Sequence, residues 1–231
     1  AGPGWTYPIA LLGTSLLGLG AGVSAGPLNA YPQVLFASRS ESAVVALHTV
    51  VGVGLSPRGN DRPAARSNVS TSPVRFLAAL GAWYRASKRT RPLMDGFSFH
   101  PYPNRATDPL ERGYPWPNAG FVNLDRIKQA LWDAFRGTPQ PTTPTGLKLY
   151  LDEVGWQVDT SELPGYTGVE NVPVTDEATQ AAVYGELVAR AVCDPDVAEV
   201  NVFGFYDDTE RAGFQAGLHL PDGTARQSAE A

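Results

Sequence analysis

An acid ends the apolar run in "LYLDEVGW", residues 149–156. Leu149, Leu151 and Glu153 are two positions apart, so on a strand they share one face and Asp152 is expected to point away. A carboxylate at the end of a buried strand is expected either to have a hydrogen-bond or charge partner or to take part in function. Two interpretations follow: Glu153 bonds to neighbouring backbone, or it is a reactive carboxylate at the mouth of a site.

A second pair of polar side chains follows another apolar run. His100 and Tyr102 in "FHPYPN", residues 99–104, are also two positions apart and share a face. If the two runs are neighbouring parallel strands about 4.8 Å apart, the Tyr102 hydroxyl can reach the Glu153 carboxylate. The alternative is that His100 merely packs beside Pro101 in a turn.

These residues require a sheet that brings the ends of several strands together. Apolar runs alternate along the chain with segments whose apolar residues repeat at helical spacing, which predicts parallel strands with crossover helices. The expected strands lie near 47–54 (within the apolar run 43–55), 95–100, 148–153 and 199–205, adjacent in that order, and the expected helices at 72–88, 123–135 and 175–193.

The spacing of the strands limits the architecture. Their centres fall near residues 50, 97, 150 and 202, so each strand–helix unit takes roughly 50 residues. An eight-stranded α/β barrel needs eight such units, but only about 45 residues precede the first strand. The sheet is therefore either open or the back half of a barrel.

The strand ends resemble those of retaining glycoside hydrolases in the large (β/α)8-barrel clan that holds families 5 and 39, the cellulase type. His100 and Tyr102 match the His-x-Tyr that often ends strand six, and Glu153, Gly155 and Trp156 match the nucleophilic Glu followed by Gly-Trp after strand seven. The closing pattern after strand eight is matched by Asp208, Gly213, Gln215, Gly217, Leu218, residues 222–224 and Ser228.

This resemblance covers about residues 47–228 and implies both a fold and an activity. The fold is an α/β TIM-type (β/α)8 barrel, incomplete, with residues 43–231 as strands five to eight and residues 1–42 unassigned. The activity is hydrolysis of O-glycosidic bonds in a polysaccharide or oligosaccharide, with Glu153 as nucleophile and net retention. Tyr102 would hydrogen-bond Glu153, and His100 would orient substrate hydroxyls.

Aromatic side chains near the strand ends are candidate sugar-binding platforms. Trp156 follows the candidate nucleophile, and Trp116 lies in the long loop after His100. Sugar rings stack on aromatic faces, so both are expected to bind substrate. For Trp116 an ordinary loop-anchoring role is equally open.

The acid that should partner Glu153 is missing from its expected place. In the clan it is a Glu that follows Asn at the end of strand four, but no Asn-Glu pair lies before residue 43. Glu41 is the only carboxylate before Asp61, and it lacks this motif. The chain thus resembles a truncated or partly degenerate member with impaired activity; the alternatives are a non-catalytic carbohydrate-binding protein and a non-functional barrel fragment.

Composition argues against several other classes of protein. The net charge of −5 and the absence of any Lys/Arg cluster larger than "SKRTR" argue against nucleic-acid or anionic-membrane partners. One cysteine and three dispersed histidines predict no metal site, and no cofactor is expected. The acidic run around Asp207 and Asp208 is expected to form a solvated corner paired with Arg211 rather than a cation site.

The apolar run 9–25 reads like the core of a secretory signal peptide, which predicts a secreted or extracellular protein. A buried helix, a disordered lead-in or a segment foreign to this fold are the alternatives.

A half barrel would leave one strand edge unpaired, and such edges tend to associate. We therefore predict that the isolated chain forms dimers or is poorly soluble, unless residues 1–42 cover the gap. Light scattering on the purified chain checks this; a monodisperse monomer with residues 1–42 disordered by NMR would contradict it.

Overall fold

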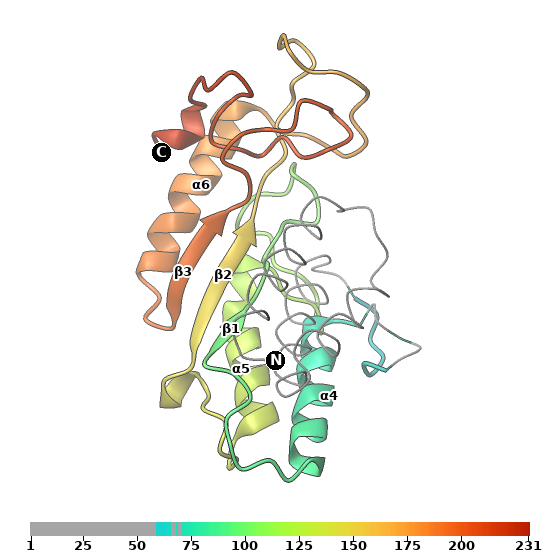
Figure 1. Cartoon of the computed structure of the whole chain (residues 1–231), viewed down its shortest axis with the longest axis vertical. Helices are drawn as coiled ribbons and strands as arrows, with labels where there is room; N and C mark the ends of the chain where they lie inside the picture. The colour runs from blue at the N-terminus through green and yellow to red at the C-terminus, as the bar shows by residue number, and fades with distance from the viewer. Residues whose placement is uncertain (1–58, 66–67, 69–70) are drawn as a thin grey trace, which may run out of the picture.

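The computed structural model describes residues 59–65, 68 and 71–231 (Figure 1). The first predicted strand, in the run 43–55, and the unassigned segment 1–42 lie outside the described residues. Within the described ranges the chain is a mixed α/β structure with a three-stranded parallel sheet. The incomplete (β/α)8 barrel therefore stays a prediction.

The sheet consists of β1 (Gly96–Ser98), β2 (Lys148–Val154) and β3 (Val197–Val202), adjacent in that order. Both pairings are parallel, which confirms the predicted order and direction of these three strands. The last strand ends earlier than expected, because Gly204 takes φ +89° and the chain leaves the extended conformation there.

Two of the helices begin at residues whose side chains cap them. The Ser72 hydroxyl accepts from the Arg75 amide at 3.4 Å, and the Asp176 carboxylate accepts from the Thr179 amide at 2.7 Å. The helical segments are α4 (Pro73–Ala86), η2 (Phe121–Asn123), α5 (Leu124–Phe135), η3 (Thr143–Thr145), α6 (Glu177–Val192) and η4 (Gln227–Ala229). The three predicted α-helices are thus confirmed within one or two residues of their expected ends.

The core lies between the sheet and these helices. Fully buried residues of the sheet and of the predicted helical stripes join one apolar cluster: Phe97, Phe99, Leu149, Leu151, Leu77, Ile127, Leu131, Phe135 and Leu187. Helices α4 and α5 meet at Gly81, where a Cβ atom would lie 2.6 Å from the Ala134 carbonyl oxygen. Only glycine permits that approach without displacing the neighbouring backbone.

A buried ion pair holds the C-terminal segment against α6 and the preceding loop. Arg226 is 1% exposed, Asp207 is 6% exposed, and the Arg226 Nε lies 3.1 Å from Asp207 Oδ2. The Tyr166 hydroxyl donates to the same oxygen at 2.6 Å, and Glu177 of α6 contacts the guanidinium. The prediction of a solvated corner paired with Arg211 is wrong for Asp207, because Arg211 donates to loop carbonyls instead.

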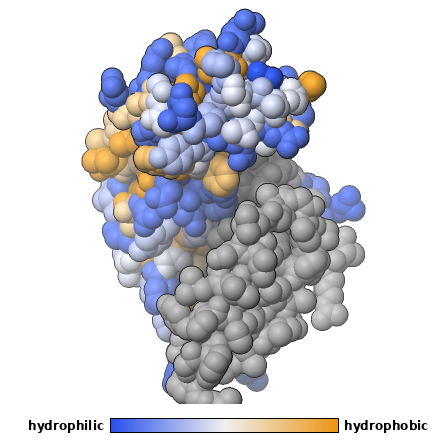
Figure 2. All heavy atoms as spheres, turned by 45° about the horizontal axis from the view of Figure 1, so that its top comes forward, coloured by the Kyte–Doolittle hydropathy of each residue, from blue (hydrophilic) through white to orange (hydrophobic). Residues whose placement is uncertain are grey.

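The end of the molecule that carries the loops is mostly hydrophilic, with scattered apolar side chains (Figure 2). In the part of the chain that the structure describes, no helix has the length and apolar character needed to span a membrane.

Replacing Asp207 by Ala should destabilise the fold by about 3–5 kcal/mol, because the buried Arg226 guanidinium loses its buried charge partner and keeps only the partly exposed Glu177. Urea unfolding followed by circular dichroism measures the change. The matched control is Asp125→Ala, whose side chain is 99% exposed, and which should change stability by less than about 0.5 kcal/mol. Equal stabilities for the two variants would contradict a structural role for the buried pair.

Candidate active site

His100 lies between two carboxylates that come from consecutive residues of β2. Its side chain is 3% exposed, with Nε2 3.0 Å from Asp152 Oδ1 and Nδ1 2.6 Å from Glu153 Oε2. Nδ1 makes no well-aligned hydrogen bond, so its contact with Glu153 is a close electrostatic one. One imidazole therefore connects two acids at the carboxyl end of β2.

An irregularity in β2 makes this arrangement possible. Leu151 pairs with Val200 and Val154 with Val202, so β2 takes three steps where β3 takes two. This extra residue is a β-bulge, which breaks the alternation of side chains. The expectation that Asp152 points away from Glu153 is wrong, because both carboxylates contact His100.

The charge of His100 follows from its two neighbours. Burial alone would lower the pKa of the imidazole, but contacts with Asp152 and Glu153 outweigh burial and raise the pKa to about 9. The imidazole is therefore a cation at neutral pH. Burial would raise the pKa of Asp152, but hydrogen bonds from His100 and Ser98 outweigh it and hold that pKa below its usual value.

Tyr102 completes the cluster from the loop after β1. Burial, the negative charge of Glu153 and a hydrogen bond to that carboxylate together raise the pKa of Tyr102, so the phenol stays a neutral donor. Its ring packs edge-to-face against His100 and Phe214, with centroids 6.5 Å and 5.9 Å apart. The predicted convergence of Glu153, His100 and Tyr102 is confirmed; their roles toward a substrate stay predictions.

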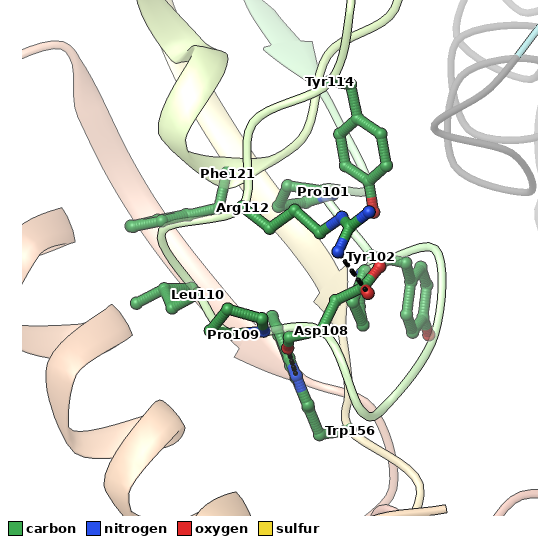
Figure 3. Close-up of a pocket in the computed structure, with 10 residues that line it drawn as sticks. Pro101, Tyr102, Asp108, Pro109, Leu110, Arg112, Tyr114, Phe121 and Trp156 are labelled. Carbon is green, nitrogen blue, oxygen red and sulfur yellow. Dashed lines mark hydrogen bonds and ion pairs between the residues drawn. The ribbon is translucent and has the colours of Figure 1, made fainter. Parts of the chain in front are cut away.

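Trp156 is a packing residue in the structure. It is 2% exposed, and its indole Nε1 donates to the Asp108 carbonyl oxygen at 3.1 Å (Figure 3). Tyr184 packs edge-to-face against the indole at 6.4 Å. The expected stacking of Trp156 on a sugar is not supported, because neither face of the ring is open.

The pocket beside Trp156 does not change this conclusion. Prolines, Tyr102, Asp108 and Arg112 are among its lining residues (Figure 3). Its volume is about 10 Å³, which suits about one water molecule and not a sugar ring.

Trp116 is available for contact, with 54% of its surface exposed. The Arg75 guanidinium lies over the ring, 4.6 Å from its centroid, so one part of the aromatic surface already has a cation–π partner. A substrate-binding role for Trp116 stays a prediction.

Sequence reasoning missed Ser98 and Asp152. The Ser98 hydroxyl donates to Asp152, with both carboxylate oxygens at 2.6 Å. The available signal was the spacing of Ser98, His100 and Tyr102, which puts three polar side chains on one face of a strand and its extension. The bulge that adds Asp152 to this group leaves no mark in the sequence pattern.

The cluster fixes one carboxylate, that of Glu153, in place. Glu153 is 27% exposed, and it has a cation on one side and a phenol donor on the other. Asp152 is a poor general acid, because such an acid needs a raised pKa and that of Asp152 is lowered. Among the described residues no group of three or more His, Cys, Asp or Glu side chains is suited to hold a metal ion.

Comparisons with known proteins give only distant likenesses. No protein-family model matches the chain, and no curated protein matches it. A monomeric beta-xylosidase from Caulobacter crescentus CB15 is 18% identical, with a TM-score of 0.41 over 86% of this chain and 36% of that one. The catalytic core of xylanase A is 14% identical, with a TM-score of 0.38 over 68% of this chain and 43% of that one.

A beta-glucuronidase from Bifidobacterium dentium is 18% identical, with a TM-score of 0.33 over 59% of this chain and 20% of that one. The chain thus spans less than half the length of each of these three proteins. Likenesses with TM-scores below 0.5 do not establish a shared fold.

The raised pKa of His100 predicts a pH-dependent contribution to stability. The folded value of about 9 exceeds the ordinary 6.5, so the contribution is fully present below pH 6.5 and is lost as pH rises through 9. Unfolding free energies of the wild type and His100→Gln, measured by urea from pH 6 to 10, should converge by about 3 kcal/mol over this window. A difference that stays constant with pH would contradict the charged imidazole.

Proposed function

We propose that this chain acts on carbohydrates as a retaining glycoside hydrolase, with Glu153 as the nucleophile that attacks O-glycosides of an oligosaccharide or polysaccharide. The observation that carries the proposal is the setting of Glu153. Its carboxylate is partly exposed at the carboxyl end of a parallel strand, where active sites of α/β barrels lie, and His100 and Tyr102 converge on it.

The proposed first step is attack by a Glu153 oxygen on the anomeric carbon. A carbon–oxygen bond to Glu153 forms, and the bond to the leaving oxygen breaks with its electron pair going to that oxygen. The His100 cation and the Tyr102 hydroxyl both contact this carboxylate and hold it in place for the attack. Water then opens the glycosyl ester, with overall retention.

The leaving oxygen of a natural sugar also needs a proton. Asp152 does not suit this task, and no Asn-Glu pair precedes residue 43. General acid catalysis is worth on the order of 10² to 10⁴-fold. We therefore propose that the 231-residue chain by itself is impaired on natural glycosides and reacts best with leaving groups that depart as stable anions.

Binding without catalysis is the second candidate. Phe203, Phe205 and Tyr206, just after β3, are 42%, 58% and 56% exposed. Exposed aromatic rings of this kind favour stacking on sugars, which a non-catalytic carbohydrate-binding protein would use.

Glu153 should be trapped by 2,4-dinitrophenyl 2-deoxy-2-fluoroglycosides, because dinitrophenolate leaves without a proton and the fluorine slows opening of the ester. A panel of such glycosides that differ in the sugar is incubated with the purified chain, and intact-mass spectrometry followed by peptide mapping locates the label. We expect one glycosyl group on Glu153 and none in Glu153→Gln, with Asp125→Asn labelled like the wild type.

No label from any sugar in the panel would count against the nucleophile. Calorimetric binding of oligosaccharides without labelling would favour the binding protein instead. Efficient cleavage of a natural polysaccharide by the purified chain would show that an acid had been missed, and Glu41 and Asp61 would be the first residues to replace.

A further inference from the structure

We propose that Asp152 is a positioning residue that acts on Glu153 through His100, by holding the imidazole charged and oriented toward the reactive carboxylate. The inference deepens the proposed function and rests on it, because it concerns how the proposed nucleophile is held. It assigns a role to an acid that does not itself touch the reacting atoms.

Asp152 is itself fixed in place. The Ser98 hydroxyl lies 2.6 Å from both of its carboxylate oxygens, and Oδ1 lies 3.0 Å from His100 Nε2. A carboxylate at the surface usually samples several rotamers, but this one has a donor on each side. The Asp152 side chain is 31% exposed, so it borders solvent while it stays hydrogen-bonded to Ser98 of β1.

His100 depends on Asp152 for its charge. The imidazole is 3% exposed, so water solvates its cation poorly and burial favours the neutral form. Among the described residues the charged groups that face it are Asp152 and Glu153, and the other titratable group is the Tyr102 phenol. Without Asp152, a single carboxylate would have to offset burial.

The contacts of His100 with Asp152 and Glu153 use opposite nitrogens of one ring. Nε2 faces Asp152, and Nδ1 lies 2.6 Å from Glu153 Oε2. A contact at Nε2 restricts rotation of the ring about its attachment and so fixes the direction of Nδ1. Loss of Asp152 therefore changes both the charge and the direction of the group that faces Glu153.

The experiment follows two nuclei in the intact chain and needs no turnover. ¹⁵N-labelled imidazoles and ¹³C-labelled Glu side-chain carboxyls are titrated by NMR from pH 5 to 10.5, with the signals assigned through His100→Gln and Glu153→Gln. In the wild type we expect His100 to titrate near pH 9 and the Glu153 carboxyl signal to follow the same midpoint.

In Asp152→Asn, which keeps the size of the side chain, both midpoints should fall by at least one pH unit, a tenfold loss of proton affinity at His100. Asp152→Glu should restore part of this change, and Ser98→Ala should lower the midpoint by less than Asp152→Asn does. The matched control Asp125→Asn, at a side chain that is 99% exposed, should leave both midpoints unchanged.

An unchanged His100 midpoint in folded Asp152→Asn would overturn the proposal. If that variant does not fold, Asp152→Ser, which also removes the charge, is titrated instead, and an unchanged His100 midpoint there would overturn the proposal. A fall at His100 that the Glu153 signal does not follow would also overturn it, because Asp152 would then act on the imidazole alone. Absence of fluoroglycoside labelling counts against the proposed nucleophile and leaves these titrations to decide the positioning role separately.

Discussion

A buried positive charge at His100 is the constraint on which the site depends. An imidazole that is 3% exposed keeps its proton only because Asp152 and Glu153 both approach it. This requires that β1 and β2 run parallel and in the observed register, so that His100, two residues after β1, meets the end of β2. The chemistry of the cluster is thus a consequence of strand pairing and one bulge.

The loops on the far side of the site are held by a second set of contacts. Gly155 lets the Phe214 ring come close, since a Cβ atom there would lie 2.8 Å from it. Phe214 in turn packs against Tyr102, the donor to Glu153. The buried pair of Asp207 and Arg226 fixes the segment that carries Phe214. Stability of the C-terminal segment and the geometry of the phenol are therefore connected.

Periodicity in the sequence was sufficient for the three helices. The alternation of strand-like and helix-like segments indicated parallel strands in chain order, and such a sheet brings His100, Tyr102 and Glu153 to one edge. The burial of Trp156 could not be foreseen, because its indole partner Asp108 is 48 residues away in the chain. The contact of Asp152 with His100 depends on a bulge that alternation cannot indicate, and the partner of Asp207 is 19 residues away.

Because of the bulge in β2, the positions of Asp152 and Glu153 depend on the number of residues in this strand as well as on their identity. The residues between Leu151 and Val154 are Asp152 and Glu153 themselves, so removal of either takes away one of the two acids and shifts the other against β3. In homologous genes, therefore, selection should remove insertions and deletions in this strand more strictly than conservative replacements. A gap inside this strand in an alignment would indicate a lineage that has lost the site.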